Sequence, residues 1–306
     1  MNNMSDIMDK IETMKRFIAV ANTGSFTRAA EQMNVPKSAI SSSISRLEEH
    51  LHTRLLYRST RQVSLTESGE RYLIQSQRLL DELEGLEDQF QRESFTLSGT
   101  IRVDMPSRFF STLIAPNLPD WFARYPNTHI EILGADYRID PIKERVDCVI
   151  RGGKLQDSNL VARALGKMEM INCISPTYAQ QFGVPRTLDD LASHYVVDYA
   201  ADSYQQPNGF EYYAHQESHY VDVPSLISVR TTDAYLAACL NGLGIIQLPK
   251  CGVEQQLRNG DLIEVLPEYR CESMSMSVLY ESRHQQPRRL SEFIDWLTQV
   301  FKAVND

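Results

Sequence analysis

Small hydroxyl side chains and one lysine lie close together at the beginning of a segment with helical periodicity. The set consists of Lys37, Ser38, Ser41, Ser42 and Ser45. The acidic pair Glu48-Glu49 follows only at the far end of the same segment. Hydroxyl and ammonium groups on one helix face can hydrogen-bond to the base edges or phosphates of nucleic acid. The pattern therefore indicates a helix face that hydrogen-bonds to nucleic acid.

Three short helices are expected to position this face. Apolar residues recur at helical spacing over residues 11–21, and Gly24 is expected to end that helix in a left-handed conformation. Ser25 can cap a second helix over residues 27–33. The third helix buries apolar residues at i, i+4 and i+7, namely Ile40, Ile44 and Leu47. Two helices joined by a short turn, the second with a polar outer face, are the layout of a helix-turn-helix.

Arginines follow the third helix. Arg54, Arg58 and Arg61 lie just before residues 62–65, which alternate as a strand does, so a small wing is expected beside the helix. Residues 1–66 hold nine Lys and Arg against six Asp and Glu, although the whole chain carries a net charge of -9. The basic excess is modest and local, which suits a small anion-facing module attached to a larger acidic body.

A heptad pattern occupies residues 67–93. Its core positions advance by alternating steps of four and three residues: Tyr72, Ser76, Leu79, Leu83, Leu86 and Phe90. One apolar stripe on an otherwise charged helix, about 40 Å long at about 1.5 Å per residue, must bury against another surface. A second copy of the chain is the expected partner. The alternative is that the helix packs on its own body.

From Ser98 onward, strands and helices alternate, which is typical of an α/β fold with a mainly parallel sheet. The first helix is expected around Leu113 to Arg124. Two strand–helix cycles in about 200 residues predict two lobes, with a ligand cleft between them at the carboxyl ends of the strands.

Polar residues lie where this cleft is expected. Ser107-Arg108 and Thr231-Thr232 each stand at the beginning of a helix, where free backbone N–H groups attract anions. Arg151 ends a strand and can supply a cation or pair with an acid in the hinge. The alternative for Ser107 and Thr231 is that they only cap their helices.

The sequence contains no G-x-S-x-G elbow, phosphate-binding loop or H-E-x-x-H motif, so no enzyme, cofactor or metal is expected. His215 and His219 are four residues apart, but their aromatic neighbours indicate a strand rather than a metal-binding helix. The five cysteines are odd in number and have no C-x-x-C pair, which predicts reduced thiols. Without a secretion signal or a bilayer-length apolar run, a cytoplasmic protein with no membrane partner is expected.

Several strings resemble the LysR-type transcriptional regulators. In the N-terminal part they are Phe17-Ile-Ala-Val-Ala-Asn-Thr-Gly-Ser-Phe-Thr-Arg-Ala-Ala-Glu31, Ser38-Ala-Ile-Ser41, Ile44-Ser-Arg-Leu-Glu48, Thr53-Arg-Leu-Leu56 and Leu65-Thr-Glu-Ser-Gly69. Later strings that resemble the same family are Leu160-Val-Ala-Arg-Ala-Leu-Gly166, Ser175-Pro-Thr-Tyr178, Asn241-Gly-Leu-Gly-Ile-Ile-Gln-Leu-Pro249 and Phe293-Ile-Asp-Trp-Leu297. The similarity is nearly continuous over the N-terminal module and looser over the rest of the chain.

The resemblance implies an α/β fold with an all-α-rich N-terminal winged helix-turn-helix and a two-lobed, periplasmic-binding-protein-like (Rossmann-like) effector domain. The DNA-binding domain would span residues 1–66, the linker and dimerisation helix 67–97, and the effector domain 98–306. Within the last of these, lobe I would comprise 98–166 and 269–306, and lobe II 167–268. The implied partners are double-stranded DNA with a partly palindromic operator, a small-molecule effector, a homodimer or homotetramer partner and, for an activator, RNA polymerase.

The resemblance also carries DNA contacts over, position by position. Lys37, Ser38, Ser41 and Ser42 would lie near base edges, and Thr27, Arg58 and Arg61 would contact phosphates or the minor groove. Pro36-Lys37 stands where the family usually has Ser-Gln, and Ser42-Ser43 stands where Arg-Gln often follows. Since Lys donates to guanine or phosphate whereas Gln favours adenine, the preferred operator sequence is expected to be shifted.

In family members, the residues corresponding to Ser107 and Thr231 hold a small carboxylate or similar effector, and the resemblance puts Asp202 and Tyr204 near the opposite wall. The expected effector-binding residues are Ser107, Arg108, Arg151, Asp202, Tyr204, Thr231 and Thr232. One alternative is a two-lobed solute-binding protein or enzyme with an incidental helical N-terminus. Another is a thiol-based redox-sensing regulator, for which Cys251 and Cys271, flanked by Lys250 and Arg270, are the better candidates.

Overall fold

The computed structural model describes residues 3–58, 63–90, 97–134, 136–137, 139–141, 144, 146–153, 155, 158–200, 209–281 and 286–305. The chain divides into two compact units. One consists of Met1–Ser94 with Gln285–Pro287, and the other of Phe95–His284 with Arg288–Asp306. Expected residues Arg61, Asp202 and Tyr204 lie outside the described residues.

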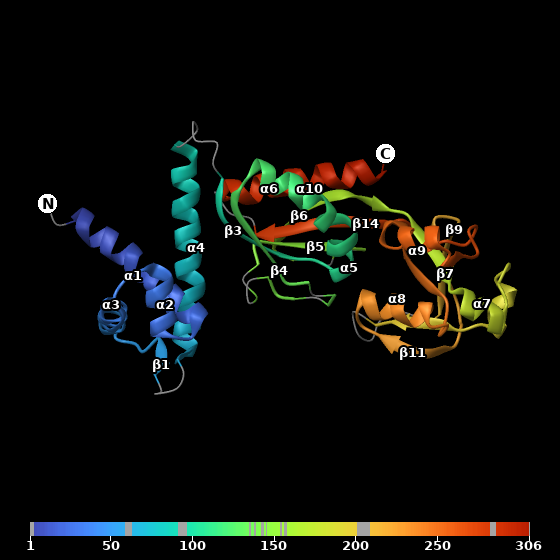
Figure 1. The fold of residues 1–306 in the computed structure, drawn as a ribbon, viewed down its shortest axis with the longest axis horizontal. Coiled ribbons are helices and arrows are strands. Elements are labelled where there is room, and N and C mark those ends of the chain that lie inside the picture. The colour runs from blue at the N-terminus through green and yellow to red at the C-terminus, as the bar shows by residue number, and fades with distance from the viewer. Residues whose placement is uncertain are drawn as a thin grey trace. The chain divides into compact units, whose positions relative to one another are not determined.

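The first unit consists of helices and a two-stranded hairpin (Figure 1). Its elements are α1 (Asn3–Thr23), α2 (Phe26–Met33), α3 (Lys37–His50), β1 (Leu56–Arg58), β2 (Val63–Leu65) and α4 (Glu67–Phe90). The left-handed conformation predicted for Gly24 is confirmed by its φ of +61°. Ser25 caps α2 as predicted, because its side chain accepts a hydrogen bond from the N–H of Arg28.

One apolar cluster joins the helices of this unit. Phe17 of α1, Ile40 and Ile44 of α3, and Leu73 of α4 are each 0% exposed within it. Ala29 of α2 is also fully buried, and its small side chain lets the helices approach closely. The predicted buried face of the third helix is therefore confirmed.

Polar contacts fix the hairpin between α3 and α4. Glu48 Oε1 accepts hydrogen bonds from the backbone N–H groups of Leu55 (2.8 Å) and Leu56 (3.1 Å). Thr66 Oγ1 accepts from the N–H of Gly69 at the start of α4 (3.0 Å). A Cβ atom on Gly69 would lie only 2.0 Å from the carbonyl oxygen of Leu55, so this close approach requires glycine.

The second unit has two lobes. Lobe I is built on a five-stranded sheet in the order β4-β3-β5-β14-β6. The strands are β3 (Ser98–Asp104), β4 (Asn127–Ile132), β5 (Cys148–Gly152), β6 (Leu160–Met168) and β14 (Met274–Glu281). β3 is parallel to β4 and β5, whereas β14 is antiparallel to β5 and β6. The sheet is thus mixed, with the expected parallel order in its first three strands.

Helices α6 (Leu118–Arg124) and α10 (Arg288–Asn305) lie together on one face of this sheet (Figure 1). Trp121 of α6 packs edge-to-face on Phe293 of α10, with ring centroids 5.4 Å apart. The helix expected around Leu113 to Arg124 is present, but it is not one regular α-helix. The segment is divided into α5 (Ser107–Phe109), a π-turn (Phe110–Ile114), a 3₁₀-turn (Ala115–Asn117) and α6. Pro116 and Pro119 account for the changes after Ile114, because neither has the N–H that a regular α-helix requires.

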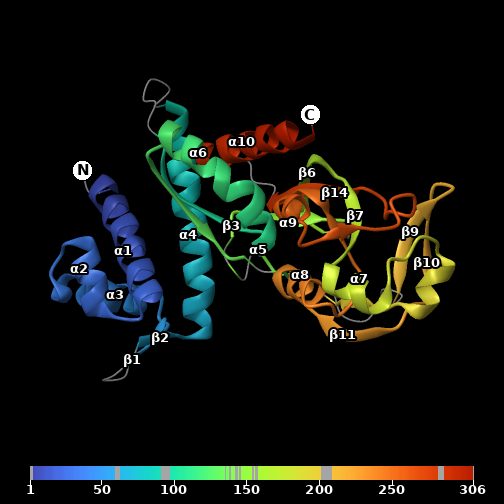
Figure 2. The ribbon, with the colours of Figure 1, turned by 45° about the vertical axis from the view of Figure 1, so that its right-hand side comes forward.

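Lobe II contains three small sheets, in the orders β12-β7-β13, β11-β8 and β10-β9. The strands are β7 (Met170–Ile174), β8 (Val196–Tyr199), β9 (Phe210–Ala214), β10 (Glu217–Val221), β11 (Ser225–Val229), β12 (Ile246–Pro249) and β13 (Ile263–Glu264). The helical elements are α7 (Pro176–Phe182), α8 (Thr232–Leu240), α9 (Glu254–Asn259) and two 3₁₀-turns, Asp189–Ser193 and Lys250–Gly252. α5 of lobe I and α8 of lobe II lie side by side (Figure 1, Figure 2).

Candidate functional site

The first turns of α3 present a polar face to solvent. Lys37, Ser38 and Ser42 are exposed, and Ser41 is half-buried. Pro36 precedes the helix without a side-chain cap, as its lack of a hydroxyl predicts. Because α3 buries its opposite face in the core, the polar side chains are held on a fixed backbone.

Ser43 has a different role from its serine neighbours. It is 1% exposed, and its Oγ accepts a hydrogen bond from Arg16 Nη1 of α1 (2.6 Å). This buried contact ties α3 to α1. Ser43, where the family often has a long polar residue, therefore serves packing within the unit.

The other expected DNA contacts are placed in part. Thr27 is exposed near the beginning of α2, and Arg58 ends β1, although the Arg58 side chain is outside the described set. Arg61 is not described. The structure thus brings Thr27 and the α3 face into one compact unit.

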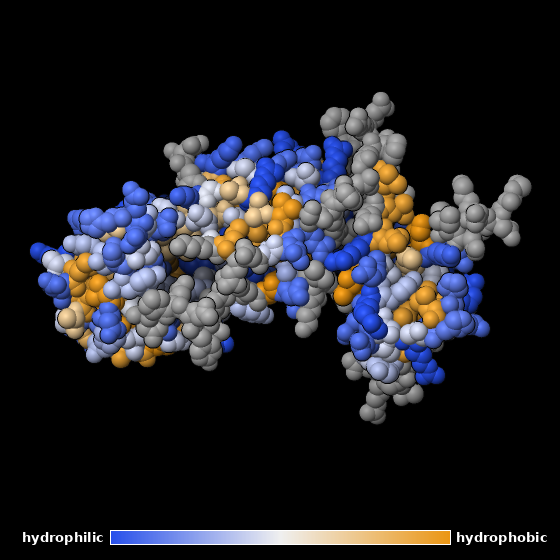
Figure 3. Space-filling view, turned by 180° about the vertical axis from the view of Figure 1, so that it is seen from behind, coloured by the Kyte–Doolittle hydropathy of each residue, from blue (hydrophilic) through white to orange (hydrophobic). Residues whose placement is uncertain are grey.

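The heptad positions of α4 divide into two groups. Tyr72 packs edge-to-face on Phe17 of α1, with ring centroids 5.3 Å apart, and Ser76 is 3% exposed. Farther along the helix, Leu79 and Leu86 are 49% and 42% exposed, and Leu83 is half-buried. Figure 3 shows apolar residues gathered along this helix. The beginning of α4 therefore packs on its own unit, whereas its later leucines remain accessible; the Phe90 side chain is outside the described set.

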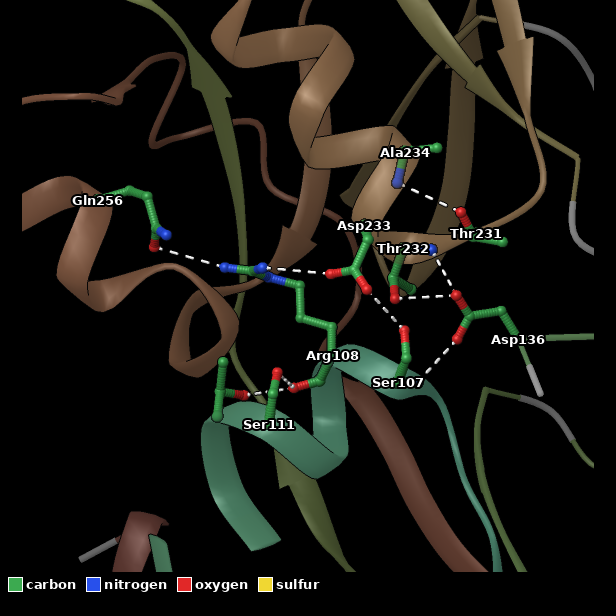
Figure 4. Close-up of polar contacts among 10 residues, drawn as sticks. Ser107, Arg108, Ser111, Asp136, Thr231, Thr232, Asp233, Ala234 and Gln256 are labelled. Atoms are coloured by element: carbon green, nitrogen blue, oxygen red, sulfur yellow. Dashed lines mark hydrogen bonds and ion pairs between the residues drawn. The ribbon is translucent and has the colours of Figure 1, made fainter. Parts of the chain in front are cut away.

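The effector residues expected at helix beginnings meet between the two lobes (Figure 4). Ser107 Oγ of α5 donates to Asp233 Oδ2 of α8 (2.9 Å). Arg108 Nη1 lies 3.6 Å from Asp233 Oδ1, and its Nη2 is 3.5 Å from Gln256 Oε1 of α9. Lobe I thus supplies a hydroxyl and a guanidinium group, and lobe II supplies the acceptors.

A second carboxylate, Asp136, bridges the same two lobes. Its Oδ1 accepts from the backbone N–H of Ser107 (3.0 Å). Its Oδ2 accepts from the N–H of Thr232 (2.7 Å) and from Thr232 Oγ1 (3.1 Å). The N–H groups expected to attract an anion are therefore hydrogen-bonded to an anion from the chain itself.

Thr231 and Arg151 have structural partners. Thr231 caps α8, because its Oγ1 accepts from the N–H of Ala234 (3.3 Å). Arg151 Nη2 donates to Asp104 Oδ2 and to the carbonyl oxygen of Tyr137. Thr231 therefore caps its helix, and Arg151 pairs with an acid, as the alternative interpretations of these two residues predicted.

Arg108 lies in an unusual environment for a cation. Burial lowers its pKa, and the nearby charge of Asp233 opposes that shift. Its Nε atom is buried and has no hydrogen-bond partner among the described residues. The side chain is held between Asp233, Gln256 and Gly252, whose Cβ position would be 3.7 Å from Nε.

Sequence reasoning missed Asp136, Asp233 and Gln256. Asp233 could have been identified from the sequence, because it directly follows the Thr231-Thr232 pair at the start of α8. Asp136 could not, because it lies past the end of β4 in a segment without helical or strand periodicity.

The five cysteines are buried or half-buried free thiols. Burial raises the pKa of all five thiols, and that of Cys239 and Cys271 to about 12. Such thiols stay protonated at neutral pH and are poor nucleophiles. The redox-sensing alternative is therefore not favoured, even for Cys251 and Cys271 with their basic neighbours.

His215 and His219 lie on a β-hairpin, as their aromatic neighbours indicated. His215 is in the turn between β9 and β10, and His219 Nε2 is hydrogen-bonded to the carbonyl oxygen of Ala214 (3.1 Å). Among the described residues no three His, Cys, Asp or Glu side chains are grouped as metal ligands would be. In the same part of the chain, none of the helices has both the length and the apolar character that crossing a membrane requires.

Comparisons with known proteins agree with this two-part organisation. Residues 11–70 match the bacterial regulatory helix-turn-helix proteins of the lysR family, and residues 96–302 match the LysR substrate binding domain. The chain is 40% identical to the uncharacterized HTH-type transcriptional regulator YhjC of Escherichia coli (strain K12), with 98% of this chain and all of that protein covered. It is 32% identical to the HTH-type transcriptional activator AaeR of the same strain, with 97% and 96% covered.

A solved structure gives the same result. CrgA, a LysR-type transcriptional regulator from Neisseria meningitidis, is similar with a TM-score of 0.60 and 30% identity, over 95% of this chain and 98% of that one. These relatives are named as regulators of transcription and not as enzymes. The chain therefore belongs to the LysR family of DNA-binding transcriptional regulators.

Proposed function

We propose that this regulator reads its operator with the first turns of α3 and responds to a small molecule held between lobes I and II. The observation that carries the proposal is the exposed face formed by Lys37, Ser38 and Ser42. Ile40 and Ile44 anchor the same helix in the core, so the face keeps its shape as it enters the major groove.

The side chains on and around this face have distinct roles. Lys37, Ser38, Ser41 and Ser42 contact base edges, with Lys37 donating to guanine or to a phosphate. Thr27, Arg58 and Arg61 contact phosphates or the minor groove and set the orientation of the helix. Base contacts supply sequence preference, whereas phosphate contacts supply affinity for any duplex.

Two copies of the unit bind a partly palindromic operator. The accessible stripe of α4, represented by Leu79, Leu83 and Leu86, supports pairing of two chains as a dimer or within a tetramer. Pairing makes the second half-site interaction intramolecular, so weak half-sites combine into a specific site. Where the protein activates transcription, RNA polymerase is its further partner, and its compartment is the cytoplasm.

The effector is a small molecule with an anionic group. Its binding residues are Ser107, Arg108, Arg151, Asp202, Tyr204, Thr231 and Thr232. Residues 98–306 form this effector domain, with residues 67–97 as the linker and residues 1–66 as the DNA-binding domain. An effector that prefers one arrangement of the lobes shifts the assembly toward it, and with it the spacing of the DNA-binding domains.

Gel shifts on the DNA upstream of the chain's own gene, repeated across salt concentrations, test the proposal. The full-length protein should shift this duplex, and its log affinity should fall linearly with log salt as counterions are released. Lys37→Ala should lose about 1–3 kcal/mol on the specific duplex and little on an unrelated one, whereas Arg61→Ala should lose affinity for both.

The matched control is Gln255→Ala, an exposed polar residue on α9. It should bind both duplexes like the unmodified protein. No shift of the upstream DNA at low salt would contradict the proposed function. Equal losses for Lys37→Ala and Arg61→Ala on the two duplexes would contradict the division into base and phosphate contacts.

A further inference from the structure

We propose that Asp136 is an intramolecular ligand that occupies the position of the effector's acidic group and holds lobes I and II together until an effector replaces it. The inference rests on the proposed function, since it concerns the same cleft. It adds a residue that competes with the effector and thereby sets how much effector the regulator needs.

The first argument is the set of donors around the Asp136 carboxylate (Figure 4). One oxygen accepts from the Ser107 N–H of lobe I, and the other accepts from the Thr232 N–H and hydroxyl of lobe II. A carboxylate group of an effector at this position could accept the same three hydrogen bonds. Charge-assisted hydrogen bonds of this kind are stronger than neutral ones, so the contact favours the joined lobes.

The second argument is mutual exclusion. An effector carboxylate at Ser107 and Thr232 would need N–H groups that already donate to Asp136. It would also lie within a few ångströms of the Asp136 charge, where like charges repel. The effector and Asp136 therefore cannot use these donors together, and binding must be an exchange of one carboxylate for the other.

The third argument is that Asp136 lies outside the strands of the sheet. It follows β4, which ends at Ile132, and therefore belongs to no strand of the sheet. Gly134, between the strand and Asp136, has a φ of +69° and no atom within 4 Å of its Cβ position. Rotation at Gly134 can move the carboxylate away without breaking a strand pairing, although the Tyr137 carbonyl would then lose its contact with Arg151.

Asp233 does not duplicate this role. Its carboxylate accepts from Ser107 Oγ and pairs with Arg108, so it joins the lobes through side chains only. It leaves the backbone donors of Ser107 and Thr232 to Asp136. After an exchange, the Asp233 contacts can therefore keep the lobes aligned around the effector.

The exchange raises the effector concentration that the regulator needs for a response. The apparent dissociation constant of the effector equals the intrinsic constant divided by the fraction of molecules in which Asp136 has left the donors. A variant without this carboxylate should bind a carboxylate probe more tightly. The tethered anion thus suppresses responses to low levels of small organic acids.

Hydrogen exchange on the full-length protein, followed by mass spectrometry, tests the inference with acetate as the probe. In Asp136→Ala the peptides that contain the Ser107 and Thr232 amides should exchange about tenfold faster, because their acceptor is missing. Acetate should restore their protection in Asp136→Ala and have much less effect on the unmodified protein. Asp136→Asn, which keeps the shape but not the charge, should show a smaller acceleration of the same amides.

The matched control is Asp190→Ala, because Asp190 also accepts from two backbone N–H groups, those of Arg186 and Thr187. Its substitution should accelerate exchange only there, without a response to acetate. Unchanged exchange at Ser107 and Thr232 in Asp136→Ala would overturn the inference. So would acceleration that acetate does not reverse, or equal acetate effects in both proteins. The experiment contains no DNA, so its failure is distinct from a failed operator shift.

Discussion

Asp104 and Arg151 form an ion pair at the carboxyl ends of the adjacent strands β3 and β5. The Asp104 side chain is fully buried and that of Arg151 is 16% exposed. Arg151 also donates to carbonyl oxygens of Ile150 and Tyr137. The guanidinium group at this edge of the sheet thus has its partners within lobe I, whereas that of Arg108 reaches across to Asp233 of lobe II.

Removing the Arg151 side chain should destabilise lobe I strongly. Arg151→Ala takes the paired cation from a fully buried carboxylate, which we expect to lower the free energy of unfolding by about 3 kcal/mol. Urea unfolding followed by tryptophan fluorescence measures this, because both tryptophans, Trp121 and Trp296, lie in the lobe I core. Arg163→Ala, which breaks the exposed pair with Asp295, is the control and should change stability by less than about 1 kcal/mol. Equal effects of the two substitutions would contradict the role of burial.

The carboxylate of Glu48 should be needed for a correctly folded wing. Glu48→Ala removes the acceptor for the N–H groups of Leu55 and Leu56, both 2% exposed. An unsatisfied buried donor destabilises by about 1–3 kcal/mol, and the wing should also lose its position beside α3. Thermal unfolding by circular dichroism and operator gel shifts measure the two effects. The control is Glu49→Ala, at the exposed neighbouring position, which should change neither the thermal stability nor operator binding. If Glu48→Ala also changed neither, the Glu48 contact would not be what holds the wing.

Local patterns were sufficient to predict the first unit. The buried positions of α3, the left-handed Gly24 and the Ser25 cap each depend on residues within one or two helical turns. Pro116 and Pro119 are a comparable local signal within Leu113 to Arg124, and the prediction of a single helix there did not use them.

The cleft could be predicted only in part. Ser107 and Thr232 were identified because each begins a helix, which is a local feature. Asp136 lies 29 residues from Ser107 and 96 residues from Thr232, so the three come together only through the tertiary arrangement of the two lobes. Long-range carboxylate contacts of this kind leave no periodic signal in a single sequence.

Self-association should depend on the accessible leucines of α4. Leu79→Asp puts a charge on a side chain that is 49% exposed in its own unit, so the unit should fold while the chain–chain contact weakens. We expect a smaller sedimentation coefficient and at least about tenfold weaker operator binding, since pairing of half-sites is lost. The control is Gln75→Asp, at an exposed position of the same helix. An unchanged sedimentation coefficient for Leu79→Asp would rule out this stripe as the contact.

His194 should make the stability of lobe II dependent on pH. It is 3% exposed, and its Nδ1 is hydrogen-bonded to the hydroxyl of Tyr178 (3.0 Å). Burial lowers the pKa of His194 below its usual value of 6.5, and the opposing effect of Asp190 is smaller. As pH falls through that value, the unfolded chain takes up a proton that the folded chain does not, so this contribution to stability is complete above pH 6.5 and declines below it.

Urea midpoints from circular dichroism at about pH 7.5 and about pH 5.5 measure this effect. His194→Gln keeps a hydrogen-bonding side chain that does not titrate, so its midpoint should fall less between the two pH values than that of the unmodified protein. His129→Gln removes an exposed histidine and should keep the full decrease. If His194→Gln and the unmodified protein lose the same stability, the pH dependence must come from other groups, because the substitution removes the imidazole whose protonated form burial disfavours.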